Sequence, residues 1–270
     1  MDLEKIKQIE KAYHEVYRDG EGPLEAVDVQ KVNSTIFQPC YANGNDRYSD
    51  NKIAFHKLIL KDGGWSGKNM LLDYACGDGF WSAYFALTGA KKVIGFDIAE
   101  SGIRRGRERI KTQGLTDKVK LFVMDACKLD FPDNTFDIVV GTAVLHHIIK
   151  YPNIFEELHR VMRPGAKAYF LEGLADFFLW KLWWKIKGQV PSGDVPMFSK
   201  EIRSKTSMFS HVEITGDTFL FSIKTILWKP RLGKVRRLIL KTCKKTDDLL
   251  FRICPSFRQL GSFSYIVLSK

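Results

Sequence analysis

The sequence predicts an α/β protein with a doubly wound, mostly parallel, seven-stranded Rossmann-like sheet. Short apolar runs alternate with helix-like stretches between residues 70 and 172, the pattern of buried strands joined by crossover helices. The first run leads into Asp73 and then into a glycine-rich turn at 76–79, which is how α/β proteins bring backbone close to a ligand. A length of 270 residues and a hydrophobic content of 45% suit one such domain with small additions.

Helical segments are expected before the sheet begins. Residues 1–18 carry apolar side chains near helical spacing and are predicted to form an amphipathic helix. Residues 20–50 are polar and turn-rich, and a short helix is expected at about 50–61. We therefore predict a helical cap or lid over residues 1–62 and a sheet domain over residues 63–270.

Strands and helices are expected to alternate through the sheet domain. We predict strands near 70–75, 92–97, 119–124, 136–141 and 167–172, and helices near 79–88, 100–113 and 151–162. The sequence Arg163-Pro164-Gly165 is predicted to be the turn that ends the last of these helices. Two later segments, 212–223 and 262–268, are predicted to close the sheet as an antiparallel pair, so that the last strand is antiparallel.

Two insertions, at 175–200 and 224–258, do not belong to a minimal sheet. The second is predicted to be a basic helical insertion. Eleven Lys or Arg residues and two Asp residues between Lys224 and Arg258 give it a net charge of +9, out of +11 for the chain. Such a block indicates an anionic partner, either phospholipid headgroups or nucleic acid, or else a solvated helix face.

The cysteines and the hydropathy pattern predict a cytoplasmic protein. Five cysteines without CxxC spacing are typical of reduced thiols and predict neither a disulfide framework nor a metal site. The N-terminus is charged and lacks the apolar core of a signal peptide. No apolar run approaches the roughly 20 residues of a membrane-spanning helix, so any membrane association is expected at the inner face.

Acidic residues at the predicted strand ends indicate the kind of cofactor. Asp97 lies 20 residues beyond Gly77, which matches the acid that hydrogen-bonds ribose hydroxyls in nucleotide-binding βαβ units. This match alone fits NAD or S-adenosylmethionine. The loop D-x-A-C-G-D-G from Asp73 carries two acids, a poor lining for a pyrophosphate but a suitable one for the ammonium of a methionine moiety. Asp125 ends the third predicted strand, where it can accept a hydrogen bond from an adenine amino group.

Four motifs extend this pattern over residues 69–173. They are LLDYACGDGFW, GFDIAESGI, MDACKLDFPDNTFDIVVGTAVLHHI and ELHRVMRPGAKAYFLEG. In this order and spacing the chain resembles the class I S-adenosylmethionine-dependent methyltransferases, especially the type 11 group of small-molecule methyltransferases. The resemblance implies S-adenosylmethionine as cofactor and S-adenosylhomocysteine as product.

The resemblance also implies roles for individual residues. Asp73, Gly77 and Gly79 line the methionine end, Asp97 holds the ribose, and Ile98 packs on the adenine face. Asp125 and Ala126 contact the adenine edge, while Gly141 and Thr142 lie beneath the methionine and open toward the acceptor. Ala75 departs from the family pattern, because it stands where the family has its first glycine. Its Cβ is expected to crowd the cofactor slightly.

Two histidines follow the fourth predicted strand, at the mouth of the expected site. His146 and His147 are candidate catalytic bases, since a histidine suits proton removal at neutral pH. The phosphoethanolamine methyltransferases, which resemble this core, carry a catalytic histidine in an equivalent position, and this favours His146. The alternative is that either histidine packs into the loop. Tyr41 and Tyr48 are candidates for a lid over the cofactor, or for a loop held by packing alone.

The two insertions bear on the methyl acceptor. Residues 175–188 combine Trp, Phe and Lys, which is typical of a helix lying in a membrane interface, of a substrate-pocket wall or of a core helix. An apolar stripe of Val235, Leu238, Ile239, Leu250 and Ile253 is predicted within the basic insertion. Together the segments favour peripheral contact with an anionic membrane and a lipid-like acceptor.

We therefore predict a methyltransferase that acts on a small or lipid-like acceptor, with a hydroxyl oxygen preferred. The main alternative is an amine, RNA or protein acceptor docked by the basic segment, and a further one is a non-catalytic cofactor-binding protein. Nucleic acid is disfavoured, because residues 141–144 read GTAV where nucleic-acid amino methylases commonly carry an N/D-P-P-Y/F turn.

Overall fold

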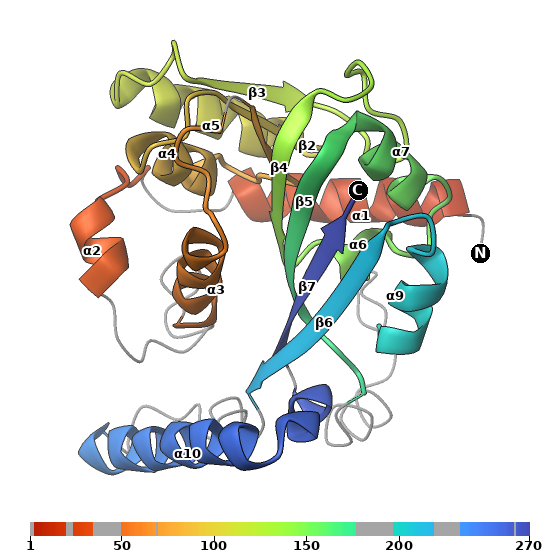
Figure 1. Ribbon diagram of the computed structural model, residues 1–270. Coiled ribbons are helices and arrows are strands. Elements are labelled where there is room, and N and C mark those ends of the chain that lie inside the picture. The colour runs from red at the N-terminus through yellow and green to blue at the C-terminus, as the bar shows by residue number, and fades with distance from the viewer. Residues whose placement is uncertain are drawn as a thin grey trace.

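The computed structural model describes residues 3–19, 24–34, 50–68, 70–176, 197–218, 233–261 and 263–270. Tyr41, Tyr48 and most of the aromatic segment 175–188 lie outside these residues. The described part is built around one seven-stranded sheet with the order β3-β2-β1-β4-β5-β7-β6 (Figure 1). The predicted fold class is therefore confirmed.

Six of the seven strands run in one direction, and the last strand of the chain runs antiparallel to them. The strands are β1 (Leu71–Tyr74), β2 (Val93–Asp97), β3 (Val119–Val123), β4 (Phe136–Thr142), β5 (Met162–Gly173), β6 (His211–Thr218) and β7 (Phe263–Ser269). β7 pairs antiparallel with both β5 and β6, as predicted for the last strand. The parallel strands end at one edge of the sheet, which is where open α/β sheets bind ligands.

The boundary between the last crossover helix and β5 differs from the prediction. The helix ends at Val161, and β5 already begins at Met162. The Arg163-Pro164-Gly165 sequence therefore lies within the strand, where the pairing with β4 shifts register between Phe136 and Ile138. Gly165 has φ 78°, a backbone conformation that glycine adopts without strain and that accommodates the extra residues of the bulge.

Helices cover both faces of the sheet. One face carries α3 (Asp50–Lys61), α4 (Phe80–Leu87) and α5 (Glu100–Thr112), and the other carries α6 (Leu145–Ile148), α7 (Ile154–Val161) and α9 (Ser199–Lys205). Neighbouring strand residues face opposite layers: Leu71 belongs to the first hydrophobic cluster and Leu72 to the second. Both side chains are fully buried, because alternate side chains of a strand point to opposite faces. The two short helices α6 and α9 were not among the predicted elements.

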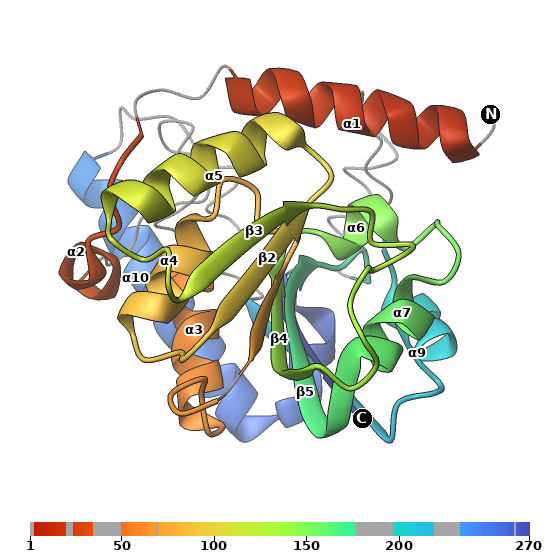
Figure 2. The ribbon, with the colours of Figure 1, turned by 90° about the horizontal axis from the view of Figure 1, so that it is seen from above.

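The N-terminal helix α1 (Leu3–Asp19) lies across the edge at which the parallel strands end. Figure 2 shows α1 beside α5 and close to α6. The Glu15 carboxylate accepts hydrogen bonds from the backbone N–H groups of Glu100 and Ser101, at 2.6 and 2.8 Å, and so caps the N-terminus of α5. A further helix, α2 (Val29–Ser34), follows. That residues 1–62 act as a lid stays a prediction.

The basic insertion contains a long helix. α10 (Gly233–Ile253) is followed by the short 3-10 helix η4 (Pro255–Leu260) and then by β7. β7 begins opposite Gly173, at the end of β5, so α10 lies at the same end of the sheet as the strand ends described above (Figure 1). None of the described helices is long and apolar enough to cross a membrane.

Candidate functional site

The glycine-rich loop after β1 is held against β2. Gly77 N–H donates to Asp97 Oδ2 at 2.9 Å, and Cys76 N–H donates to Phe96 O at 2.8 Å. Gly77 has φ 56° and Gly79 has φ 65°, conformations that a residue without Cβ adopts at low cost. The loop therefore ends β1 and starts α4 in a tight turn whose backbone faces the sheet edge.

A buried ion pair fixes the far side of this loop. The Arg109 guanidinium of α5 donates to Asp78 Oδ2 at 2.5 Å, and both side chains are almost completely inaccessible to solvent. Arg109 also donates to the Asp78 carbonyl oxygen at 3.3 Å. A buried charge is tolerated only when it is paired. The Asp78 carboxylate therefore binds Arg109 of α5 and is shielded from solvent.

Ala75 adopts the left-handed backbone conformation, with φ 56°, in the position where the family pattern has glycine. An L-residue with a Cβ pays roughly 1–2 kcal/mol in this region. We expect Ala75→Gly to stabilise the protein by about 0.5–1 kcal/mol, since part of the relief is offset by the greater freedom of glycine in the unfolded chain. Thermal unfolding should show a midpoint higher by about 1–4 °C.

Ala83→Gly, in the interior of α4, is the matched control for Ala75→Gly. It should lower the midpoint, because glycine in a helix costs about 1 kcal/mol relative to alanine. A fall in midpoint for Ala75→Gly similar to that of the control would contradict the assigned strain.

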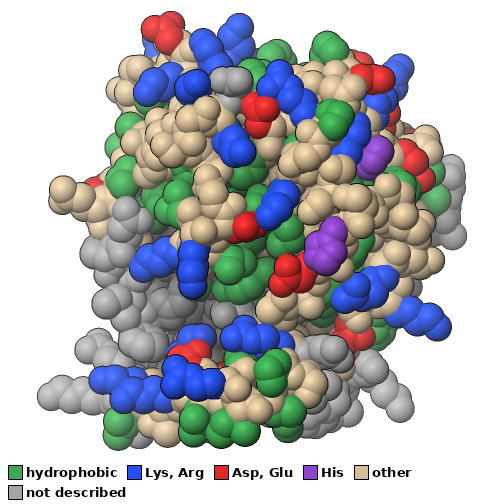
Figure 3. Space-filling model, in the orientation of Figure 1, with side chains coloured by type: hydrophobic (Ala, Val, Ile, Leu, Met, Phe, Trp, Pro, Cys, Tyr) green, Lys and Arg blue, Asp and Glu red, His purple; other side chains and the backbone are tan. Residues whose placement is uncertain are grey.

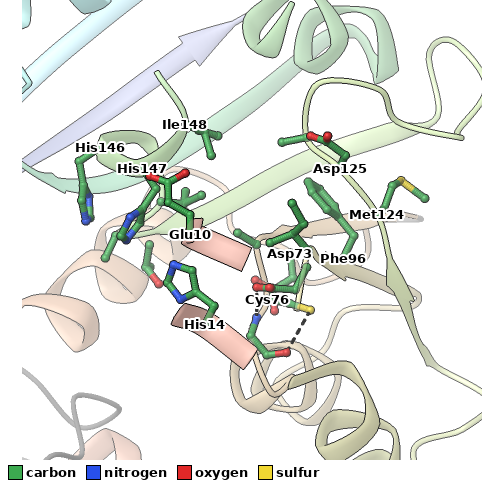
Figure 4. Close-up of a pocket in the computed structure, with 18 of the residues that line it drawn as sticks. Glu10, His14, Asp73, Cys76, Phe96, Met124, Asp125, His146, His147 and Ile148 are labelled. Carbon is green, nitrogen blue, oxygen red and sulfur yellow. Dashed lines mark hydrogen bonds between the residues drawn. The ribbon is translucent and has the colours of Figure 1, made fainter. Parts of the chain in front are cut away.

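A cavity of about 430 Å³ opens at the ends of β1 to β4. Figure 4 shows Asp73, Phe96 and Asp125 toward one end of it, and His146, His147, His14 and Glu10 toward the other. The predicted site residues that line it are Asp73, Ala75, Gly77, Asp97, Ile98, Asp125, Ala126, Thr142, His146 and His147. Gly79 does not line it: its Cα faces α5 and β3, and an added Cβ would lie 2.7 Å from Leu121 Cδ1. Tyr41 and Tyr48 fall outside the described residues.

Asp73 is a buried acid of the cavity, with 5% of its surface exposed. Burial raises the pKa of its carboxyl to about 7, against the lowering effect of the Ser82 hydroxyl, which donates to Oδ2 at 2.5 Å. The nearby Asp97 carboxylate adds to the rise. A cationic group that enters this end of the cavity would favour the ionised form of Asp73, because opposite charges stabilise each other in a poorly solvated site.

Asp97 and Asp125 each keep acceptor capacity toward the cavity. Asp97 Oδ1 accepts from Ala99 N–H and Oδ2 from Gly77 N–H, both at 2.9 Å. Asp125 accepts from Cys127 N–H at 2.9 Å and from Lys7 Nζ at 2.8 Å. Burial raises the pKa of Asp125, but these hydrogen bonds outweigh it and hold the pKa below its usual range. Each ionised carboxylate has about four lone-pair positions, so both can accept further hydrogen bonds from a ligand.

His146 is oriented by a buried carboxylate. Its Nδ1 lies 2.8 Å from Glu172 Oε2, while Glu172 Oε1 accepts from the backbone N–H groups of Val144 and Leu145 at 2.7 and 2.6 Å. The Glu172 side chain is fully buried at the end of β5. Because Nδ1 faces the Glu172 carboxylate, this pair favours the ring tautomer that carries its proton on Nδ1. Sequence reasoning missed Glu172, although an acid directly at the end of the fifth strand was a signal for it.

Helix α1 supplies the remaining wall of the cavity. Lys7, Glu10, Tyr13 and His14 line it, and none of them was predicted as a site residue. Glu10 accepts hydrogen bonds from Lys150 Nζ and, at 2.5 Å, from Tyr151 Oη, and burial together with Glu10 raises the pKa of Tyr151. The His14 ring packs edge-on against His147, with centroids 5.0 Å apart. Among the described residues, no group of three or more His, Cys, Asp or Glu side chains is arranged to hold a metal ion.

Residues 72–170 match the sequence model of a family described as a methyltransferase domain. The UbiE ubiquinone/menaquinone biosynthesis C-methyltransferase of Hydrogenovibrio crunogenus is 36% identical over 158 residues, which cover 56% of this chain and 61% of that protein. The 27-O-demethylrifamycin SV methyltransferase of Amycolatopsis mediterranei is 32% identical over 109 residues, 40% of this chain and 39% of that protein. The chain thus spans less than two thirds of the length of these curated relatives.

Solved structures share the fold. The geranyl diphosphate C-methyltransferase of Streptomyces coelicolor A3(2) superposes with a TM-score of 0.60 at 12% identity, covering 96% of each chain. At 12% sequence identity, this superposition shows a shared fold alone. The family match spans β1 to β5, and the ends of β1 to β4 line the cavity. Residues 72–170 therefore match a methyltransferase domain in sequence, within a sheet that has the fold of this solved methyltransferase.

Proposed function

We propose that this protein transfers the methyl group of S-adenosylmethionine to a ring carbon of a phenolic or quinol acceptor with a lipid-like tail. The observation that carries the proposal is the two-ended cavity, with acids at the ends of β1, β2 and β3 and an oriented histidine after β4. A volume of about 430 Å³ lies within the usual range of small-molecule sites.

The acidic end of the cavity fits the cofactor. In this proposal Asp73 faces the ammonium of the methionine moiety, Asp97 accepts from the ribose hydroxyls and Asp125 accepts from the adenine amino group, which it shares with Lys7. Ile98 and Ala126 pack against the adenine, and Thr142 lies toward the acceptor. When bound, the cofactor supplies a methyl group already activated by its sulfonium, so the protein mainly has to position the nucleophile.

The histidine end fits removal of a proton from the acceptor. Nε2 of His146 takes the proton of a ring hydroxyl, while Glu172 holds Nδ1–H and favours the imidazolium that forms. The phenolate would pass electron density to a neighbouring ring carbon, which would form the new bond to the methyl group as the bond from that methyl to sulfur breaks. That carbon would then lose its hydrogen as a proton to water, which restores the aromatic phenolate, and the His146 imidazolium would return its proton to the ring oxygen.

The choice of carbon differs from the preference that the sequence alone suggests. The sequence favours a hydroxyl oxygen, whereas the relative that matches over 158 residues is a C-methyltransferase of quinone biosynthesis. An oxygen acceptor remains the second candidate, because the relative from Amycolatopsis mediterranei is an O-methyltransferase by name. Both outcomes start from the same deprotonated ring hydroxyl.

The test is product analysis with S-adenosylmethionine labelled in its methyl group. The acceptors are a naphthoquinol with a short isoprenoid chain and a free ring position, the same quinol with that position already methylated, and phosphoethanolamine. We expect label in the first acceptor alone, attached to carbon by NMR. Label on oxygen in both quinols would replace the proposal by the second candidate, and methyl transfer only to phosphoethanolamine would overturn it.

A further inference from the structure

The outer face of α10 is divided into a basic half and an apolar half. Leu238, Leu249 and Ile253 are 66%, 54% and 72% exposed. Lys241, Lys245 and Arg252 are exposed as well. In Figure 3 the lower edge of the molecule, over α10, shows hydrophobic and basic side chains next to one another. We call these six residues the α10 outer face.

The six side chains point the same way because of their spacing. At roughly 100° per residue, they fall within one arc of about 120°. Lys241, Arg252 and Lys245 occupy one side of that arc, and Leu238, Leu249 and Ile253 occupy the other. Phe251 and Asp247, on the opposite side of the helix, are buried. Of the predicted apolar stripe, Leu238 and Ile253 are exposed and Ile239 and Leu250 are half-buried, while the side chain of Val235 lies outside the described residues. Leu249, which the prediction did not include, is exposed as well.

Near its C-terminal end, the inner side of α10 packs against η4. The Arg258 guanidinium of η4 lies 4.8 Å from the centroid of the Phe251 ring, and Cys254 N–H donates to Leu250 O at 2.8 Å. η4 in turn packs against β6. Exposed leucine and isoleucine side chains next to lysines are costly in water unless a partner covers them.

We infer that the α10 outer face docks on an anionic phospholipid bilayer. A helix that combines basic side chains on one flank with aliphatic side chains on the other lies in the headgroup region, with the aliphatic half toward the acyl chains. Nucleic acid would bind the same basic side chains, but its phosphate backbone would leave the three aliphatic side chains exposed to water. A second copy of the chain would bring like charges together.

Docking at this place matches the position of the cavity. α10 lies at the end of the sheet where the parallel strands end, and the cavity opens at that same end. This part of the inference rests on the proposed function, since a lipid-borne acceptor would then reach the cavity from the membrane. The docking itself depends only on the residues of the α10 outer face.

The test is co-sedimentation of the full chain with vesicles of phosphatidylglycerol and phosphatidylcholine, compared with vesicles of phosphatidylcholine alone. We expect binding to the anionic vesicles that weakens with salt. The double variant Lys241→Glu/Lys245→Glu should lose on the order of a hundredfold in affinity. Leu249→Ser/Ile253→Ser should lose about tenfold.

Two control variants match these changes away from α10. Lys118→Glu/Lys120→Glu makes the same change in charge on exposed residues at β3, the opposite edge of the sheet, and Leu87→Ser/Met208→Ser removes two exposed apolar side chains elsewhere. Both should bind like the unchanged protein. Equal losses in controls and α10 variants, or no vesicle binding at all, would overturn the inference, as would a basic variant that loses RNA binding while keeping vesicle binding.

A separate readout distinguishes failure of docking from failure of the proposed function. Methyl transfer to the short-chain quinol in solution should be the same in the α10 variants as in the unchanged protein. Turnover without vesicle binding would reject the docking surface and leave the function standing. Vesicle binding that depends on the α10 outer face, in a protein that does not methylate the quinol, would reject the proposed function and support the docking surface.

Discussion

Asp97→Ala is expected to weaken the binding of S-adenosylhomocysteine about a hundredfold. The variant removes a carboxylate that accepts Gly77 N–H and Ala99 N–H and that, in our proposal, accepts the ribose hydroxyls. Hydrogen bonds to a charged group contribute about 1.5–3 kcal/mol each, and a factor of ten in affinity corresponds to about 1.4 kcal/mol. Calorimetric titration measures the change directly.

Loss of folding would mimic this effect, so two further measurements accompany it. Asp117→Ala removes an exposed acid beyond α5 and should bind S-adenosylhomocysteine with unchanged affinity. Thermal unfolding of Asp97→Ala should still show a single cooperative transition. A folded Asp97→Ala protein with undiminished affinity would remove Asp97 from the cofactor site.

His146→Ala is expected to lower kcat a hundredfold or more while leaving cofactor affinity nearly unchanged. General-base catalysis by a positioned side chain typically contributes 10²–10⁴-fold, and His146 lies at the far end of the cavity from Asp73 and Asp125 (Figure 4). Single-turnover kinetics with the quinol acceptor and titration with S-adenosylhomocysteine separate the two quantities. His211→Ala, an exposed histidine on β6, is the matched control. A fully active His146→Ala enzyme would dismiss His146 as the base.

Glu172→Gln tests the positioning of that histidine. The substitution keeps the size of the side chain but removes the negative charge beside Nδ1. We expect kcat to fall about tenfold and the acid limb of the pH–rate profile to move to lower pH, because the imidazolium form loses its partner. Glu156→Gln, an exposed acid on α7, should change neither. A fall in rate with an unmoved acid limb would mean that Glu172 supports the loop and does not act through His146.

The acidic end of the cavity, which we propose to hold the cofactor, was largely predictable from the sequence. The apolar runs, the turn around Gly77 and the acids Asp73, Asp97 and Asp125 are all local features, each at the end of a predicted strand. Since parallel strands end at one edge of a sheet, predicting the strands was enough to bring these acids together. Gly79 shows the limit of the motif, because the same glycine pattern serves packing against Leu121 and Gly106.

The acceptor side was less predictable, because it depends on contacts between distant segments. Glu172 meets His146 across 26 residues, and Glu10 of α1 meets Tyr151 across 141. No periodicity or motif encodes such a pairing. It follows from the path of α1 across the sheet edge and from the place where β5 ends beside the loop after β4.

The sequence by itself thus determined the doubly wound sheet, the methyltransferase motifs and the acidic end of the cavity, since strand and turn formation depend on neighbouring residues. The tertiary structure alone decided three matters. Glu172 orients His146, α1 closes one wall of the cavity, and Leu249 rather than Leu250 joins the exposed face of α10. Each of these rests on which surfaces pack together, and packing between distant segments is set by the whole fold.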